Sequence, residues 1–181
     1  VLGAGAVAEP TIDVGVGPNS AFSKLALAAG LIVAGQTFNP YADDISFLLG
    51  ASIFEDVGVT AYAGAARFIG NPDFVEAAAG ILAVEAYHSG AIRTLLANIG
   101  AGQAFGLISN LRATLSAQVG GPGTAADVGI LIPGQNYNFV PNDINALAFR
   151  RTSAQVLNIV YGGGAASGNL FFPNKLNGNI A

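Results

Sequence analysis

The spacing of apolar residues along the chain predicts a series of helices. In the first of them the apolar positions Phe22, Leu25, Leu27, Leu31 and Ile32 fall on one helical face. Polar segments rich in Gly, Pro, Asn or Asp interrupt each apolar run, as expected where a helix ends. The predicted helices cover residues 20–33, 43–69, 72–98, 105–119 and 152–161.

Local signals fix where the two longest helices begin. Asp43 or Asp44 is a good N-cap for the second helix, and Pro72 suits the first turn of the third. Gly50 and Gly58 each lower the helix propensity of the second helix by about 1 kcal/mol relative to Ala, but their small size permits close approach of a neighbour. The third helix is apolar nearly all round, which predicts burial on most sides.

The segments between and beyond the helices read as irregular. Residues 1–18 are rich in Gly, Pro and Val and predict an extended N-terminal segment, and residues 120–150 mix Pro, Gly and Asn with isolated apolar positions. The tail, residues 162–181, carries Phe171 and Phe172 and predicts an ordered C-terminal wrap. We therefore expect one mainly α domain over residues 1–181.

Composition narrows the class of protein. Hydrophobic residues make up 52% of the chain and charged residues 10%, against about a quarter charged in ordinary domains. Such a chain is too apolar to be disordered. Its low charge predicts that much of its surface is covered by other subunits or by an upstream part of the chain. The longest apolar run, residues 25–34, is shorter than the ~20 residues of a membrane-spanning helix, so no transmembrane segment is predicted.

Charge and residue usage exclude several partners. The net charge is -4 and Arg150–Arg151 is the only adjacent pair of cations, so nucleic-acid binding is not expected. There is no cysteine, hence no disulfide or thiolate metal site, and no Asn-x-Ser/Thr sequon for an N-linked glycan.

The opening "VLGAGAVAEP" is not a signal peptide, and we interpret Val1 as a processed or truncated start.

One pattern points to metal chemistry. Glu85 and His88 lie at i and i+3 on the predicted helix 72–98, and so project to one side. Glu-x-x-His is the inward-facing element of di-metal carboxylate bundles, in which other helices add single Glu ligands. Glu55 on the preceding helix supplies one such Glu, and the oxygen-rich set suits iron or manganese.

These three residues are only half of the expected ligand set. Glu9 and Glu76 are badly placed to complete it, and the chain has no second histidine. A structural alternative stays open: Glu85 and His88 would then hydrogen-bond or ion-pair inside a bundle, or meet Arg93.

Three segments together resemble the desiccation-related proteins, a family with a ferritin-like domain. They are "NPYADDISFLLGASIFEDVGVTAYAGAA" (39–66), "AAGILAVEAYHSGAIRTLL" (78–96) and "TSAQVLNIVYGGG…GNLFFPNKLNGNI" (152–180). The resemblance implies a ferritin-like four-helix bundle whose first two helices are missing here, with Val1 near the end of the second.

By the same resemblance, Glu55 matches the family's third-helix ligand, and Glu85 with His88 matches its fourth-helix pair. Iron or manganese would then bind only if an upstream segment or another chain supplies the remaining ligands; otherwise no cofactor is expected. The family is associated with drying and stress, and many members look secreted, which implies an extracellular location.

Two functions follow, and we favour the first. It is a structural or stress-protective protein without enzymatic activity. This protein assembles either with copies of itself, as a homo-oligomer, or with its own missing N-terminal segment. Self-assembly would give a dimer or an extracellular filament. The alternative is a di-iron or di-manganese protein with oxidase or metal-storage activity. A weaker third idea is glycan or membrane binding by Tyr137, Phe139, Phe171 and Phe172. The first two require helices 43–69 and 72–98 to pair antiparallel, with Glu55 near His88.

Overall fold

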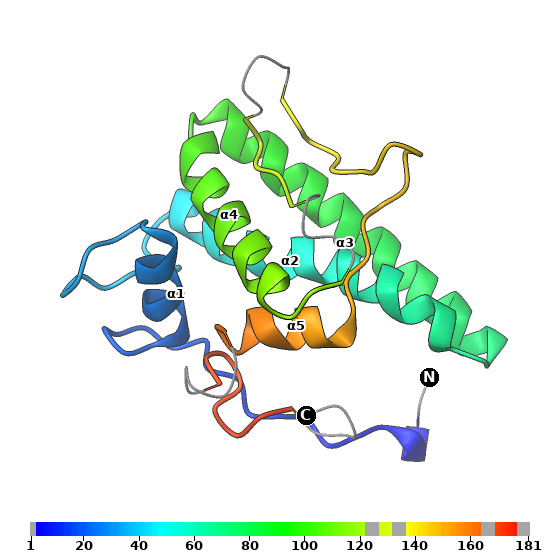
Figure 1. Ribbon diagram of the computed structural model, residues 1–181. Helices are drawn as coiled ribbons and strands as arrows, with labels where there is room; N and C mark the ends of the chain where they lie inside the picture. Colours follow the sequence, from blue (N-terminus) through cyan, green and yellow to red (C-terminus); the bar gives the residue numbers. More distant parts are fainter. Residues whose placement is uncertain (1–2, 122–126, 132–136, 164–168, 177–181) are drawn as a thin grey trace.

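The computed structural model describes residues 3–121, 127–131, 137–163 and 169–176, and these are mainly helical, as predicted (Figure 1). Within them no strand forms beyond an isolated antiparallel bridge between Asn142 and Ala148. Val1 and parts of the 120–150 and 162–181 segments lie outside this description. The helices are α1 (Ala21–Ala29), α2 (Asp44–Ala65), α3 (Pro72–Asn98), α4 (Gly102–Gln118) and α5 (Ser153–Val160), with 3-10 turns at Gly3–Gly5 and Ala66–Phe68.

Side-chain caps explain the helix boundaries. Asp43 accepts a hydrogen bond from the Ser46 amide at 2.7 Å, which confirms it as the N-cap of α2. Thr152 and Gln155 form a capping box at the start of α5. Gly30 adopts a left-handed conformation (φ 78°) and ends α1, so the predicted extension to residue 33 is wrong.

The two longest helices pack side by side in opposite directions, joined by the turn before Pro72 (Figure 1). Gly58 brings α2 close to α3, because a β-carbon at this position would overlap the carboxylate of Glu85. Gly50 does the same against α1 and the following loop, where its β-carbon would lie 3.1 Å from Pro40. Both glycines therefore permit the close approach that the sequence predicts.

The main apolar core lies between α1, α2, α4 and the last turns of α3. Phe171 is fully buried there, and its ring packs edge-to-face on Phe22 and Phe54. Its carbonyl oxygen accepts a hydrogen bond from the Asp13 amide at 2.7 Å, which ties the tail to the N-terminal segment. The described part of the tail thus wraps the core as predicted.

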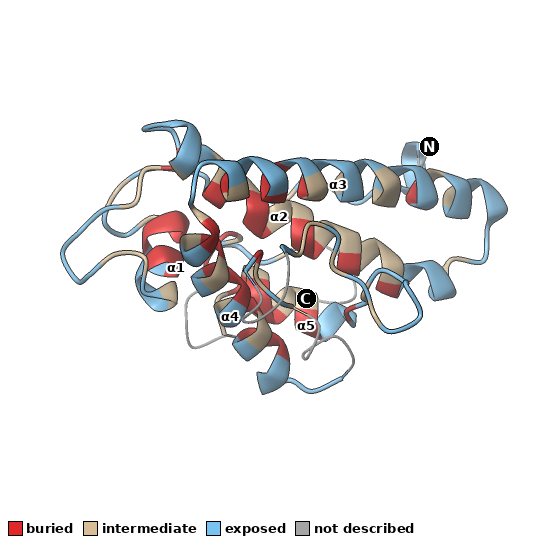
Figure 2. Ribbon diagram, turned by 90° about the horizontal axis from the view of Figure 1, so that it is seen from above, coloured by how far each residue is buried: buried red, intermediate tan, exposed pale blue. Residues whose placement is uncertain are grey.

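The outward side of α3 is open, so the prediction that this helix is buried on most sides is wrong. Figure 2 shows α3 along one edge of the molecule with much of its surface exposed. The reason is that no described element packs over this side. The buried residues of α3 are Ala78, Ser89, Ile92, Arg93 and Leu96, whereas Ile81, Val84, Tyr87 and Leu95 are exposed.

The helical stretch Asp44–Phe68 is long and apolar enough to cross a membrane by length and composition alone. The central helix of a folded domain meets the same criterion, and α2 contacts α3, α4 and α5. The absence of a transmembrane segment stays a prediction.

Candidate functional site

The residues predicted to carry the chemistry meet between α2 and α3. The Nδ1 atom of His88 lies 3.1 Å from Oε2 of Glu55. The antiparallel pairing of the two helices and the predicted proximity of Glu55 and His88 are therefore confirmed. The His88 side chain is 57% exposed and that of Glu55 is 23% exposed, so the pair lies at the surface of the described chain and not in a closed interior.

Glu85 completes this cluster from the turn of α3 that precedes His88. Burial raises the pKa of Glu85 to about 7, assisted by its hydrogen bond to Glu55 and by the charge of that neighbour, while His88 opposes the shift. The gap above Gly58 lets the carboxylate lie this close to α2. The Glu85 carboxyl group therefore titrates near neutral pH.

The cluster has the right donor types for a metal ion but not the full number. Two carboxylates and an imidazole suit iron or manganese. Within the described ranges, however, no group of three or more His, Asp or Glu side chains is arranged to hold an ion. The metal-ligand role of Glu55, Glu85 and His88 stays a prediction.

An apolar stripe on α3 runs through His88. Ile81, Val84, His88 and Leu95 follow one another at intervals of three, four and seven residues, so they share one helical face. Between 43% and 50% of each of Ile81, Val84 and Leu95 is exposed. We call these four residues the α3 stripe. It places the acid–imidazole cluster beside an exposed apolar surface.

Asp56, the neighbour of Glu55, enters a second and fully buried polar cluster. Its carboxylate accepts from Nη2 of Arg93 at 2.7 Å, from Nη2 of Arg112 at 2.6 Å and from the hydroxyl of Ser89. Burial opposes ionisation of Asp56, yet Arg112 and Arg93 hold its pKa below the usual value. Arg93 thus pairs with Asp56, and the alternative that it meets Glu85 or His88 is wrong.

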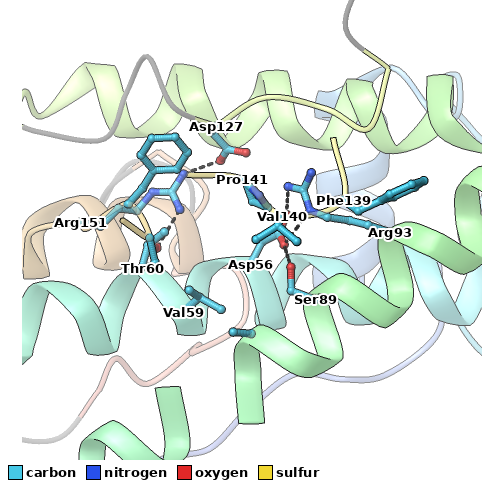
Figure 3. Close-up of a pocket in the computed structure, with 13 residues that line it drawn as sticks. Asp56, Val59, Thr60, Ser89, Arg93, Asp127, Phe139, Val140, Pro141 and Arg151 are labelled. Atoms are coloured by element: carbon cyan, nitrogen blue, oxygen red, sulfur yellow. Dashed lines mark hydrogen bonds and ion pairs between the residues drawn. The ribbon is translucent and has the colours of Figure 1, made fainter. Parts of the chain in front are cut away.

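Asp127 and Arg151 extend this cluster from the irregular segments (Figure 3). Arg112 donates to both oxygens of Asp127, at 3.0 Å from Nε and 2.9 Å from Nη2, and Arg151 donates to Oδ2 of Asp127. Arg151 also donates to the hydroxyl groups of Ser116 and Thr60. We call these charged residues the Arg–Asp network; they are Asp56, Arg93, Arg112, Asp127 and Arg151, with side chains at most 7% exposed.

The aromatic candidates divide between core and surface. Phe171 lies in the core and Phe172 packs against it, so neither forms an exposed binding surface. Tyr137 stacks on Phe139 with ring centroids 5.5 Å apart, and Tyr137 is exposed. This pair alone does not indicate a ligand.

Comparison with known proteins agrees with the resemblance stated above. The ferritin-like domain family matches residues 1–98, which include α2 and α3. The desiccation-related protein PCC13-62 of Craterostigma plantagineum is 32% identical over 133 residues, covering 66% of this chain and 42% of that protein. This chain therefore spans about two fifths of the length of the curated relative that it matches. No solved structure matches.

Proposed function

The chain belongs to the ferritin-like domain family, and on this premise we propose that it is a stress-protective structural protein that acts as part of an assembly. Its relative is named for desiccation, and the low charge of the chain suits a protein whose surfaces are covered. In this proposal α2 and α3 form one half of a helical bundle, and two further helices cover the α3 stripe.

The observation that carries the proposal is the exposed α3 stripe. Helices normally turn their apolar face toward a core, and contiguous exposed apolar surface usually marks an interaction site. Here the apolar side of α3 faces outward, and the carboxylate–imidazole cluster lies on the same side. A covering helix pair would bury both together.

We propose that a second copy of the protein provides this cover. A mutual contact would close as a dimer, whereas a head-to-tail contact would propagate into a filament. The filamentous form and the extracellular location belong to this proposal and rest on the family resemblance and the low charge.

Sedimentation velocity of the native-length protein tests the proposal. We expect an oligomer that Val84→Lys dissociates, because the lysine places a charge in the α3 stripe. Ile144→Lys is the matched control: it adds the same charge at a fully exposed position outside the stripe and should leave the oligomer intact. A monomer in which Val84→Lys changes neither sedimentation nor stability would contradict the proposal.

A second candidate function is metal binding, which the proximity of Glu55, Glu85 and His88 favours. These residues would hold one side of an iron or manganese centre, and the bound metal would supply oxidase or storage chemistry. The remaining ligands would come from the helices that cover the α3 stripe.

Elemental analysis of the native protein tests this candidate. We expect stoichiometric iron or manganese that is lost in Glu85→Gln and in His88→Ala. Glu76→Gln is the control, since Glu76 lies exposed on the same helix. Native protein without bound metal would exclude the metal function and leave the structural one in place.

A further inference from the structure

A cavity of about 80 Å³ adjoins the Arg–Asp network. Figure 3 shows Arg151 and Arg93 reaching toward its centre from opposite sides, with Asp127 and Asp56 between them. Phe139, Val140 and Phe149 provide apolar walls. The space is large enough for several water molecules or for an anion of a few heavy atoms.

The network carries an excess of positive charge. It holds three guanidinium groups and two carboxylates, all buried, which leaves one positive charge uncompensated. Asp56, Arg93, Asp127 and Arg151 line the cavity, Arg112 does not, and no further charged side chain of the described residues does so. Because a buried charge without a counter-charge is strongly unfavourable, the excess calls for an anion.

Arg151 is the one network guanidinium without a cation–π contact among the described residues. Arg93 and Arg112 lie over the ring of Phe105, with 4.6 and 5.5 Å between guanidinium carbon and ring centroid, which offsets part of their charge. Arg151 donates only three hydrogen bonds to the described residues, from Nε, Nη1 and Nη2, although a guanidinium has five N–H donors. Its two remaining N–H donors have no partner among the described residues.

The carboxylates do not need these spare donors. Each oxygen of Asp56 accepts from a guanidinium, as does each oxygen of Asp127. A ligand anion would therefore compete with water for Arg151, and not with either aspartate. A planar carboxylate matches the fork of N–H donors on a guanidinium.

We infer that this cavity binds a small monocarboxylate anion, of the size of formate or acetate, with Arg151 as its main contact. The apolar walls accommodate the hydrogen or methyl end of the ligand, while its two oxygens face the guanidinium. The site is separate from the Glu55–His88 cluster, because Asp56 and Glu55 leave α2 on different sides.

Thermal unfolding of the native-length protein, measured in sodium formate and in sodium chloride at equal ionic strength, tests the inference. Formate at ten times its Kd should raise Tm by about 3–6 °C, and chloride by less than half as much. Arg151→Gln should abolish the difference between the salts, since it removes the excess charge. Arg150→Gln removes the same charge from the exposed neighbouring residue and should retain the difference.

If Arg151→Gln does not fold, a second variant tests whether formate binds in the cavity. Val59→Phe fills the cavity from α2 and leaves all five network residues in place, so it should also abolish the formate effect. Equal Tm shifts in formate and chloride for the unmodified protein would overturn the inference, as would a formate effect that persists in Val59→Phe.

Discussion

At the residue scale, two adjacent acids on α2 have opposite environments. Successive helical residues point about 100° apart, so Glu55 faces the half-exposed side of α3 while Asp56 turns into the interior. Glu55 contacts the exposed imidazole of His88 and the carboxyl group of Glu85. Asp56 contacts two buried guanidinium groups and a hydroxyl, and it is therefore the residue on which the interior charge balance depends.

Asp56→Asn should destabilise the protein by ~3–5 kcal/mol, because it leaves Arg93 and Arg112 buried without their shared counter-charge. Urea unfolding measures this loss. The control Asp44→Asn, at an exposed first-turn position of α2, should cost less than ~1 kcal/mol. Equal losses in the two variants would contradict the importance of the Arg–Asp network.

The lowered pKa of Asp56 also predicts acid sensitivity. Its unfolded-state pKa of 3.8 lies above its folded-state pKa, so its stabilising contribution is present above pH 3.8 and is lost as pH falls through the folded value. In urea unfolding repeated down to low pH, Asp56→Asn should be less acid-sensitive than the unmodified protein. Parallel pH profiles of the two would argue against this linkage.

Glu85 predicts the opposite pH dependence. Its folded-state pKa of about 7 exceeds the ordinary glutamate pKa of 4.5, so the folded state binds more protons between these values. The free energy of unfolding therefore falls as pH rises through that window. In metal-free protein, Glu85→Gln should therefore gain stability relative to the unmodified protein at pH 8 but not at pH 4. Thermal melts at both pH values measure this, and an equal effect at both would refute it.

The sequence predicted one of these two clusters and missed the other, for a physical reason. Glu55, Glu85 and His88 lie on two regular helices, whose periodicity specifies which side chains can meet. Asp127 and Arg151 lie on irregular segments without such periodicity. Only the concentration of arginine in an otherwise apolar and weakly charged chain could have indicated that buried ion pairs exist.

At the element scale, α2 is the helix against which α3, α4 and α5 all pack. The Arg151 amide donates to the carbonyl oxygen of Thr60 at 2.9 Å, which docks the segment before α5 on α2. Gly64 makes room for this contact, since a β-carbon there would overlap the carbonyl oxygen of Arg151. Backbone contact, and not only the ion pairs, thus positions Arg151.

Gly64→Ala should destabilise the protein by ~1–3 kcal/mol, because backbone atoms must move to admit the methyl group. Gly80→Ala is the matched control, because Gly80 lies in α3 with open space around its β-carbon position. It should instead stabilise the protein by up to ~1 kcal/mol through helix propensity. Denaturant unfolding compares the two, and a neutral Gly64→Ala would contradict the close docking.

Helix positions followed from local signals, whereas helix burial did not. The capping residue Asp43 predicted where α2 begins, because a cap acts within one turn of chain. Burial of α3 depends on what packs against it, which periodicity within one helix does not contain. The apolar composition of α3 therefore indicated that other elements must pack against this helix. It did not indicate that this chain provides them.

At the scale of the whole molecule, the central claim is that the open side of α3 is covered in the native protein. His88 lies in the α3 stripe and is the only histidine of the chain, so its reactivity reports on that surface. Within the described chain its side chain is 57% exposed and accessible to reagents.

Carbethoxylation of His88 in the native-length protein, followed by peptide mapping, measures whether this side of α3 is covered. We expect slow modification in the native protein and in the control Ile144→Lys, and rapid modification in Val84→Lys, where the added charge opens the cover. Rapid modification of His88 in the unmodified native protein, at the rate of a free histidine peptide, would contradict this claim.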